Sequence, residues 1–173
     1  MEFTIKIPKS LADVKLWQLL EFSNINQDNE QVVIYKAFDL FTNLDKAHVK
    51  QLPYDVANQT LLKVNDLFKD IPTDRTIVDI DGVKYGRIPN LETITFGEYI
   101  ELDTFLTPLF NGEVNTDYSF KFMSCLFRPV IEEVGGLYKI EPFTDDYIDS
   151  EHWRKFQKHC PADIYASSVA FFF

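Results

Sequence analysis

The sequence is poor in glycine, cysteine and histidine, and it has fewer basic than acidic residues. Its six glycines form neither a GxGxxG nor a GxxxxGK[ST] motif, which disfavours a phosphate loop for nucleotides. The two cysteines, Cys125 and Cys160, form no CxxC motif, so we expect reduced thiols in a core. A net charge of −10 repels phosphate backbones and disfavours specific nucleic-acid binding.

Long apolar runs are also missing. The first eleven residues, MEFTIKIPKSL, lack the continuous apolar stretch of a secretory signal peptide. The apolar run 169–173 is far shorter than the ~20 residues that a transmembrane helix needs. We therefore expect no membrane partner.

What the chain does have is an ordinary globular composition with many aromatic residues. It has 173 residues, of which 46% are hydrophobic and 25% charged, and this predicts a single compact domain over 1–173. The aromatic residues are 16 Phe, 8 Tyr and 2 Trp. Most recur at helical spacing or in strand-like segments, so we interpret them mainly as core residues.

Apolar residues spaced three and four apart predict about six helical pieces. The clearest cover 30–41, 54–68, 96–105 and 117–127, and the C-terminal pieces cover 147–159 and 162–173. The expected caps are Asn43, Asp117 and a Thr95–Glu98 capping box, and we expect a loop over 107–116.

Strand signals occur in three places. Residues 3–7 alternate between apolar and polar and predict a short N-terminal strand that ends at Pro8. The dipeptides Asp81-Gly82 and Gly135-Gly136 predict the turns of two β-hairpins. Because antiparallel strand pairs lie between helical runs, the expected fold class is α+β rather than a doubly wound sheet.

Residues that could carry chemistry lack the spacing that known sites use. His152 and His159 are seven residues apart, whereas zinc ligands on one helix are usually three or four apart. His48 has no serine or cysteine motif nearby that would suggest a nucleophilic triad.

Carboxylates gather in two places, but neither group has the spacing of a calcium loop. We interpret them as helix-end and surface acids. We therefore expect no catalytic, cofactor-binding or metal-binding residue and no cofactor, although a metal-dependent hydrolase is kept as a third alternative. The acids in question are Asp145, Asp146, Asp149 and Glu151 in one group, and Glu98, Glu101 and Asp103 in the other.

Arg128 is the most informative cation in the sequence, because it stands between an apolar helix and Pro129. Its guanidinium can bind either carbonyl oxygens at the end of that helix or a buried carboxylate. We favour such a structural role over ligand binding.

The chain ends in Phe171, Phe172 and Phe173, which we predict to be partner-binding residues. Burying each ring is worth about 1.5–3 kcal/mol, so three exposed rings would be costly. They either dock on this chain's own core, or fill a groove of a partner, or precede further chain; self-docking ranks first without a partner.

The order of the motifs resembles that of small structural-cluster proteins of tailed bacteriophages, especially crAss-like and related phages that infect Bacteroidota. The resemblance lies in three segments, namely Pro89–Asp103 (with GEYIELD), Leu126–Pro129 (LFRP) and Tyr138–Phe143 (YKIEPF). Phe127 and Phe143 stand where the family pattern has tyrosine. The family often continues past a segment that ends in FF.

The resemblance implies a non-enzymatic virion protein, either cargo, connector or tail-associated. Its implied partners are other phage structural proteins such as portal, tail or ring components, and a homo-oligomer is left open. The implied location is the virion, with the host cytoplasm during assembly. The alternative is a tail-assembly chaperone or scaffold that is absent from the mature particle.

Overall fold

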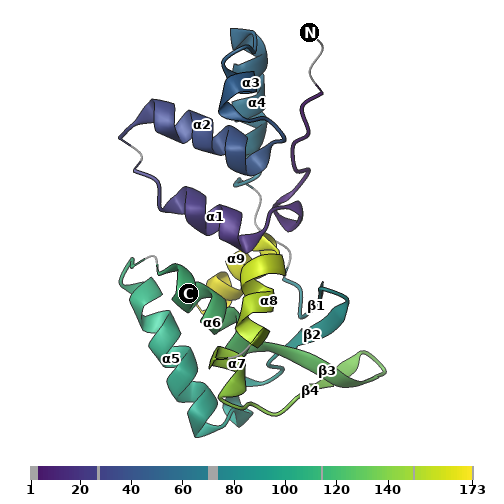
Figure 1. The fold of residues 1–173 in the computed structure, drawn as a ribbon. Coiled ribbons are helices and arrows are strands. Elements are labelled where there is room, and N and C mark those ends of the chain that lie inside the picture. The colour runs from purple at the N-terminus through teal and green to yellow at the C-terminus, as the bar shows by residue number, and fades with distance from the viewer. Residues whose placement is uncertain (1–3, 27, 70–73, 114, 150, 173) are drawn as a thin grey trace. The chain divides into compact units, whose positions relative to one another are not determined.

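The computed structural model describes residues 4–26, 28–69, 74–113, 115–149 and 151–172, and it combines helices with one antiparallel sheet (Figure 1). The predicted α+β class is confirmed. Backbone contacts divide the chain into two compact units. Unit 1 comprises 1–73 and 161–170, and unit 2 comprises 74–160 and 171–173. The single compact domain stays a prediction.

Unit 1 is helical in its described part. It begins with a 3₁₀ turn over Leu11–Asp13 and also contains most of the last helix of the chain. Its helices are α1 (Leu16–Ser23), α2 (Glu30–Phe41), α3 (Lys46–Val49), α4 (Tyr54–Asp66) and α9 (Ala162–Phe172). The helix predicted over 30–41 matches α2, because its apolar residues mark one face without interruption.

Three phenylalanine rings fix the packing of α1, α2 and the end of α4. Phe41 meets Phe22 and Phe68 edge to face, at centroid distances of 5.2 and 5.5 Å. Phe22 and Phe68 are stacked at 6.0 Å. Edge-to-face and offset contacts suit the ring quadrupoles, so the cluster adds specific geometry to the apolar burial.

The predicted N-terminal strand is absent from residues 4–8, which are extended but pair with no strand among the described residues. The side chain of Asn43 forms the hydrogen bonds to this segment that a neighbouring strand would otherwise form. Its Oδ1 accepts a hydrogen bond from the Lys6 N–H at 2.8 Å, and its Nδ2 donates to the Thr4 carbonyl at 3.2 Å. A side-chain amide thus satisfies the backbone groups that a neighbouring strand would have satisfied.

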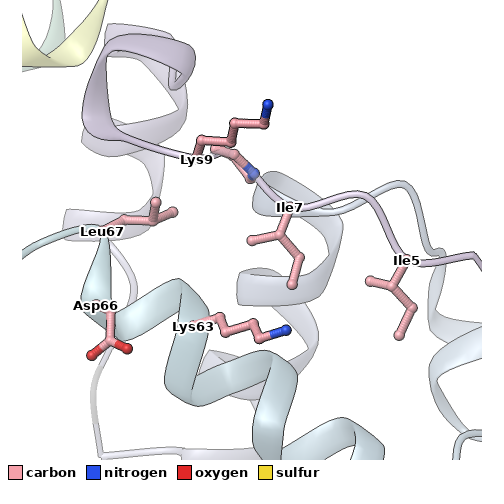
Figure 2. A pocket seen from close by; sticks show the side chains of 7 residues that line it. Ile5, Ile7, Lys9, Lys63, Asp66 and Leu67 are labelled. Carbon is pink, nitrogen blue, oxygen red and sulfur yellow. The ribbon is translucent and has the colours of Figure 1, made fainter.

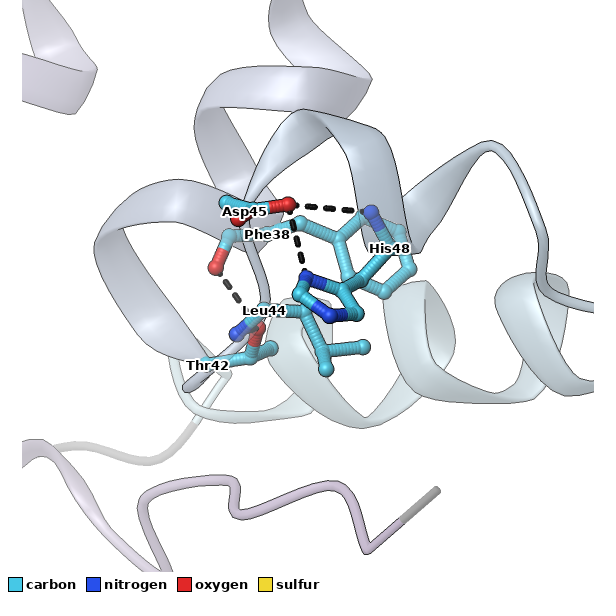
Figure 3. Close-up of polar contacts among 5 residues, drawn as sticks. All are labelled: Phe38, Thr42, Leu44, Asp45 and His48. Carbon is cyan, nitrogen blue, oxygen red and sulfur yellow. Dashed lines mark hydrogen bonds and ion pairs between the residues drawn. The ribbon is translucent and has the colours of Figure 1, made fainter. Parts of the chain in front are cut away.

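Asn43 was therefore predicted wrongly as the cap of the next helix. Asp45 caps α3 instead, because its Oδ1 accepts from the His48 backbone N–H at 2.9 Å. The same oxygen lies 2.8 Å from His48 Nδ1, as the two dashed lines in Figure 3 show. The Thr42 hydroxyl donates to the Phe38 carbonyl at 2.7 Å and closes the end of α2 (Figure 3).

The sheet lies in unit 2 and has the order β1-β2-β3-β4, with each neighbouring pair antiparallel. Both predicted hairpin turns are confirmed. Asp81 and Gly82 have φ of 55° and 74°, and Gly135 and Gly136 have φ of 60° and 82°, the two positive values that a type I′ turn requires. The strands are β1 (Ile77–Ile80), β2 (Val83–Arg87), β3 (Phe127–Val134) and β4 (Leu137–Ile140).

The helices of unit 2 divide the chain more finely than the predicted pieces. The region predicted as one helix over 147–159 is helical on both sides of residue 150, which lies outside the described residues, as α7 and α8. Asn115, not Asp117, caps α6 by accepting from the Tyr118 N–H at 3.1 Å. Besides a 3₁₀ turn over Leu91–Thr93, the helices are α5 (Phe96–Phe110), α6 (Thr116–Leu126), α7 (Asp146–Asp149) and α8 (Glu151–His159).

Helix α5 is longer than predicted, because Pro108 does not end it. The loop expected from residue 107 begins only after Phe110. The Asn111 N–H donates to the carbonyls of Thr107 and Pro108, and Gly112 adopts a φ of 77°. A residue with positive φ after the last turn is the usual helix stop, so Gly112 and not Pro108 sets the end. Within the described ranges, no helix is both long and apolar enough to cross a membrane.

The core of unit 2 is built on α6, whose residues from 119 to 126 are all buried except Lys121. α6 packs against α5, α7 and α8. Tyr85 of β2 meets Phe156 of α8 edge to face at 5.2 Å, which ties the sheet to the helices. Cys125 and Cys160 are both buried and form no disulfide with each other, as the sequence predicts. Burial raises the pKa of Cys125 to about 12.

Gly86 is required by the close approach of β4 to β2. A Cβ atom at Gly86 would lie 2.6 Å from Tyr138 Cε2 and 2.9 Å from Ile140 Cγ2. The hydroxyl of Tyr138 reaches past this position and donates to the Arg87 carbonyl at 2.7 Å. The missing side chain is thus a packing requirement, not a matter of backbone conformation.

We expect Gly86→Ala to lower the free energy of unfolding by about 1–3 kcal/mol, because Tyr138 and Ile140 must move. Gly97→Ala is the matched control, since a Cβ there meets only ordinary contacts of 3.9 Å and more in a helical segment. Denaturant unfolding of both variants measures the difference. Equal stability of the two variants would contradict the steric role of Gly86.

Candidate partner-binding site

The predicted partner-binding residues lie at the end of α9. Phe172 is half-buried, and its ring meets Phe122 of α6 edge to face at 5.8 Å. Phe171 is 53% exposed and stands perpendicular to Phe172 at 5.3 Å. Phe173 lies outside the described residues. The Phe172 ring therefore packs toward the core of unit 2, whereas the Phe171 ring is largely exposed to solvent.

Phe171 rests on a guanidinium. The Arg87 Cζ atom lies 4.6 Å from the centre of the Phe171 ring, which is a cation–π contact. Asp74 holds this guanidinium by two bonds, from Nη1 to Oδ1 at 2.6 Å and from Nη2 to Oδ2 at 3.0 Å. A forked pair of this kind fixes the plane of the arginine and so the position of the ring above it.

The backbone of Arg87 is held equally well. Its N–H donates to the Thr76 carbonyl at 2.8 Å, and its carbonyl accepts from the Tyr138 hydroxyl. Asp74 is exposed, so the site presents a half-exposed ring beside a carboxylate on a rigid strand end. This arrangement can bind another protein surface through an apolar and a polar contact.

A second arrangement in unit 2 is the buried ion pair of Glu98 and Arg128. Arg128 Nη2 lies 2.6 Å from Glu98 Oε1, and the two side chains are 5% and 6% exposed. Of the two partners predicted for Arg128, the structure shows the buried carboxylate. The Phe143 ring lies 5.9 Å from the Arg128 Cζ atom and covers it.

Glu98 is at the same time part of the predicted capping box, which is confirmed. Its Oε2 accepts from the Thr95 N–H at 2.7 Å, while its own N–H donates to Thr95 Oγ1 at 3.2 Å. Burial by itself would raise the pKa of Glu98. The Thr95 hydrogen bonds and the Arg128 guanidinium outweigh burial and lower that pKa, so the carboxylate is charged at neutral pH.

A third arrangement surrounds His152 at a cavity of about 430 Å³. The edge of Tyr147 meets the His152 ring at 4.3 Å, and the Tyr147 hydroxyl donates to Glu141. Burial, with the positive charge of Lys155, lowers the pKa of His152 to about 4, so its imidazole is neutral at pH 7. Burial and the Glu141 bond raise the pKa of Tyr147.

The two histidines singled out in the sequence have different surroundings. His152 lies among Tyr85, Tyr147 and Phe156, whereas His159 Nε2 is 3.9 Å from Asp81 Oδ1. In the part of the chain that the structure describes, no group of three or more potential metal ligands comes together. The described acids near α8 and on α5 therefore do not form a cluster that could hold a metal ion. The side chain of Asp149 lies outside the described residues.

Unit 1 has a hollow of about 410 Å³ between its N-terminal segment and α4. Figure 2 shows Ile5 and Ile7 of the segment, Lys63 of α4, and Leu67, which follows α4. The lining combines apolar side chains with the charged Lys9, Lys63 and Asp66, so this hollow is a mixed, largely polar surface groove.

Sequence reasoning missed Arg87 and Asp74 as the support for Phe171. The only signal is their charge, because the sequence places Arg87 at the end of a predicted hairpin strand but indicates no partner for its side chain. Comparison of the chain with models of protein families, with curated proteins and with solved structures found no match.

We expect Arg128→Met to lower the free energy of unfolding by about 3 kcal/mol, because it leaves the Glu98 carboxylate buried without a counter-charge. Lys139→Met is the matched control: it removes a pair of equal length, Lys139 Nζ to Glu132 Oε2 at 2.6 Å, that is exposed. Denaturant unfolding at pH 7 compares the two. A loss no larger in Arg128→Met than in Lys139→Met would refute the structural role of the pair.

The stability of unit 2 should fall as the pH is lowered from 6.5 to 4. The unfolded chain then binds a proton at His152 that the folded chain resists, since the folded pKa lies near 4. With solvent screening at the exposed edge of the ring, this amounts to about 1–2 kcal/mol. The measurement is urea unfolding at several pH values, in the wild type and in His152→Gln. An identical pH slope in both proteins would contradict the assignment.

Proposed function

We propose that this chain is a non-enzymatic bacteriophage protein that acts through protein–protein contacts in the virion, as a cargo, connector or tail-associated component. Its partners are other phage structural proteins, such as portal, tail or ring components, and its locations are the virion and, during assembly, the host cytoplasm. The observation that carries this proposal is the large apolar side chains that unit 2 exposes.

The β3–β4 hairpin gives one such surface. Ile131, Val134 and Leu137 are exposed, and the last two flank the Gly135-Gly136 turn. Exposed apolar groups of this size gathered on one element are typical of protein interfaces.

Two surface ion pairs lie on this hairpin, one between β3 and the neighbouring β2 and one between β3 and β4. Lys84 Nζ lies 2.5 Å from Glu133 Oε2, and Lys139 Nζ lies 2.6 Å from Glu132 Oε2. The apolar tip is therefore presented by a hairpin with ordered strands.

The positions of the resembling segments also support the proposal. Glu98 of the first segment pairs with Arg128 of the second, and Phe143 of the third covers that arginine. Tyr138, which opens the third segment, bonds to Arg87 next to the first. The three segments thus meet in one unit, as expected if they characterise one kind of domain.

The acidic surface fits the same proposal. A chain with a net charge of −10 is repelled by packaged DNA and remains available for protein partners.

The alternative is a tail-assembly chaperone that binds a tail protein and leaves before the particle is complete. Phe171 favours it, because a half-exposed ring on a fixed arginine can bind an apolar segment without rearrangement of the site.

The test is quantitative mass spectrometry of density-purified particles from a phage that encodes the chain, compared with infected cells. We expect its peptides in the particles at a constant ratio to the other structural proteins. Presence in infected cells but absence from particles selects the chaperone, and absence from both refutes the two functions. With Val134→Ser and Leu137→Ser combined, we expect about tenfold less incorporation, because two exposed anchors are lost. Asp145→Ser, a change at an exposed residue outside the hairpin, is the control.

A further inference from the structure

Helix α5 has two apolar faces. Leu102, Phe105 and Leu106 are buried in unit 2 on one of them. Phe96, Tyr99, Ile100 and Phe110 are exposed, at 77%, 55%, 44% and 46%. Tyr99 and Ile100 follow Phe96 by three and four residues and Phe110 follows it by fourteen, so all four side chains lie within about 100° of one another, on one stripe beside the buried face. We call this stripe the outer face of α5.

The outer face extends along the whole helix and contains one charge. Asp103 lies at the seventh residue after Phe96 and the seventh before Phe110, so it is at the middle of the stripe. Its Oδ1 has a long contact of 3.5 Å with the Thr107 hydroxyl. No cation of the described residues lies within ion-pairing distance of it. The outer face is thus an apolar strip with one uncompensated negative charge at its centre.

This position of Asp103 argues against a symmetric pairing of α5 with a second copy. A two-fold axis at the middle of an antiparallel helix pair would place Asp103 opposite Asp103 of the other copy. Two carboxylates facing one another in an apolar contact repel, and the overall charge of −10 adds to that repulsion. A second copy is therefore the wrong occupant on electrostatic grounds.

We infer that the outer face of α5 binds an amphipathic helix of a partner protein, with a lysine or arginine opposite Asp103 and apolar residues on both sides of it. A helix of that kind supplies knobs at the spacing of Phe96, Ile100 and Phe110 and neutralises the central acid. The inference rests on the proposed function only in taking protein contacts as the mode of action.

The probe is a pair of synthetic helical peptides of 18 residues with leucines on one face. They differ only in the residue at the centre of that face, lysine or glutamate. We expect the lysine peptide to bind the full chain about fivefold more tightly than the glutamate peptide, measured by fluorescence anisotropy. Asp103→Lys should reverse this preference, and Ile100→Asp should weaken both peptides.

Asp145→Lys is the matched control, because it makes the same charge change at an exposed residue outside α5 and should keep the lysine preference. Circular dichroism verifies that each variant is folded. The inference is overturned if neither peptide binds, if Asp103→Lys keeps the original preference, or if sedimentation equilibrium finds a dimer that Ile100→Asp dissociates. Loss of the chain from particles would refute the virion role but would leave the peptide preference unchanged, so the two failures are distinct.

Discussion

The ion pair of Glu98 and Arg128 is the interaction on which much of unit 2 depends. It joins the first turn of α5 to the first residues of β3, and both charges are nearly excluded from water. Such a pair is costly to bury, and each charge is tolerated only because the other is present. Thr95 adds hydrogen bonds to the carboxylate, and Phe143 covers the guanidinium. The start of the helix, the start of the strand and the segment after β4 are therefore fixed together.

Arg87 has a comparable role on the neighbouring strand and is also buried, at 8% exposure. Asp74 holds its guanidinium, Tyr138 binds its carbonyl, and Phe171 lies on its face. Gly86 makes the approach of Tyr138 possible. Both arginines are thus buried, but Arg128 binds a buried carboxylate, whereas Arg87 binds an exposed one and supports a half-exposed ring. The difference follows from the partners: Glu98 is buried, whereas Asp74 is exposed.

Large apolar side chains of unit 2 are exposed on the outer face of α5 and at the tip of the β3–β4 hairpin. Together with the net charge of −10, they are the observations from which the proposed virion role and the inferred partner helix are argued.

Sequence by itself determined the features that depend on short-range signals. Asp81-Gly82 and Gly135-Gly136 specify their turns by backbone conformation, and Thr95 with Glu98 specifies the start of α5. Tertiary structure decided the rest. Asn43 has a side chain that can cap a helix, but it hydrogen-bonds to the backbone of the N-terminal segment instead. Pro108 lies within α5, and the helix ends about one turn later, before Gly112. Arg128 found its carboxylate thirty positions earlier in the chain. A local pattern states what a residue can bind, but only the packed chain brings one of the candidates within reach.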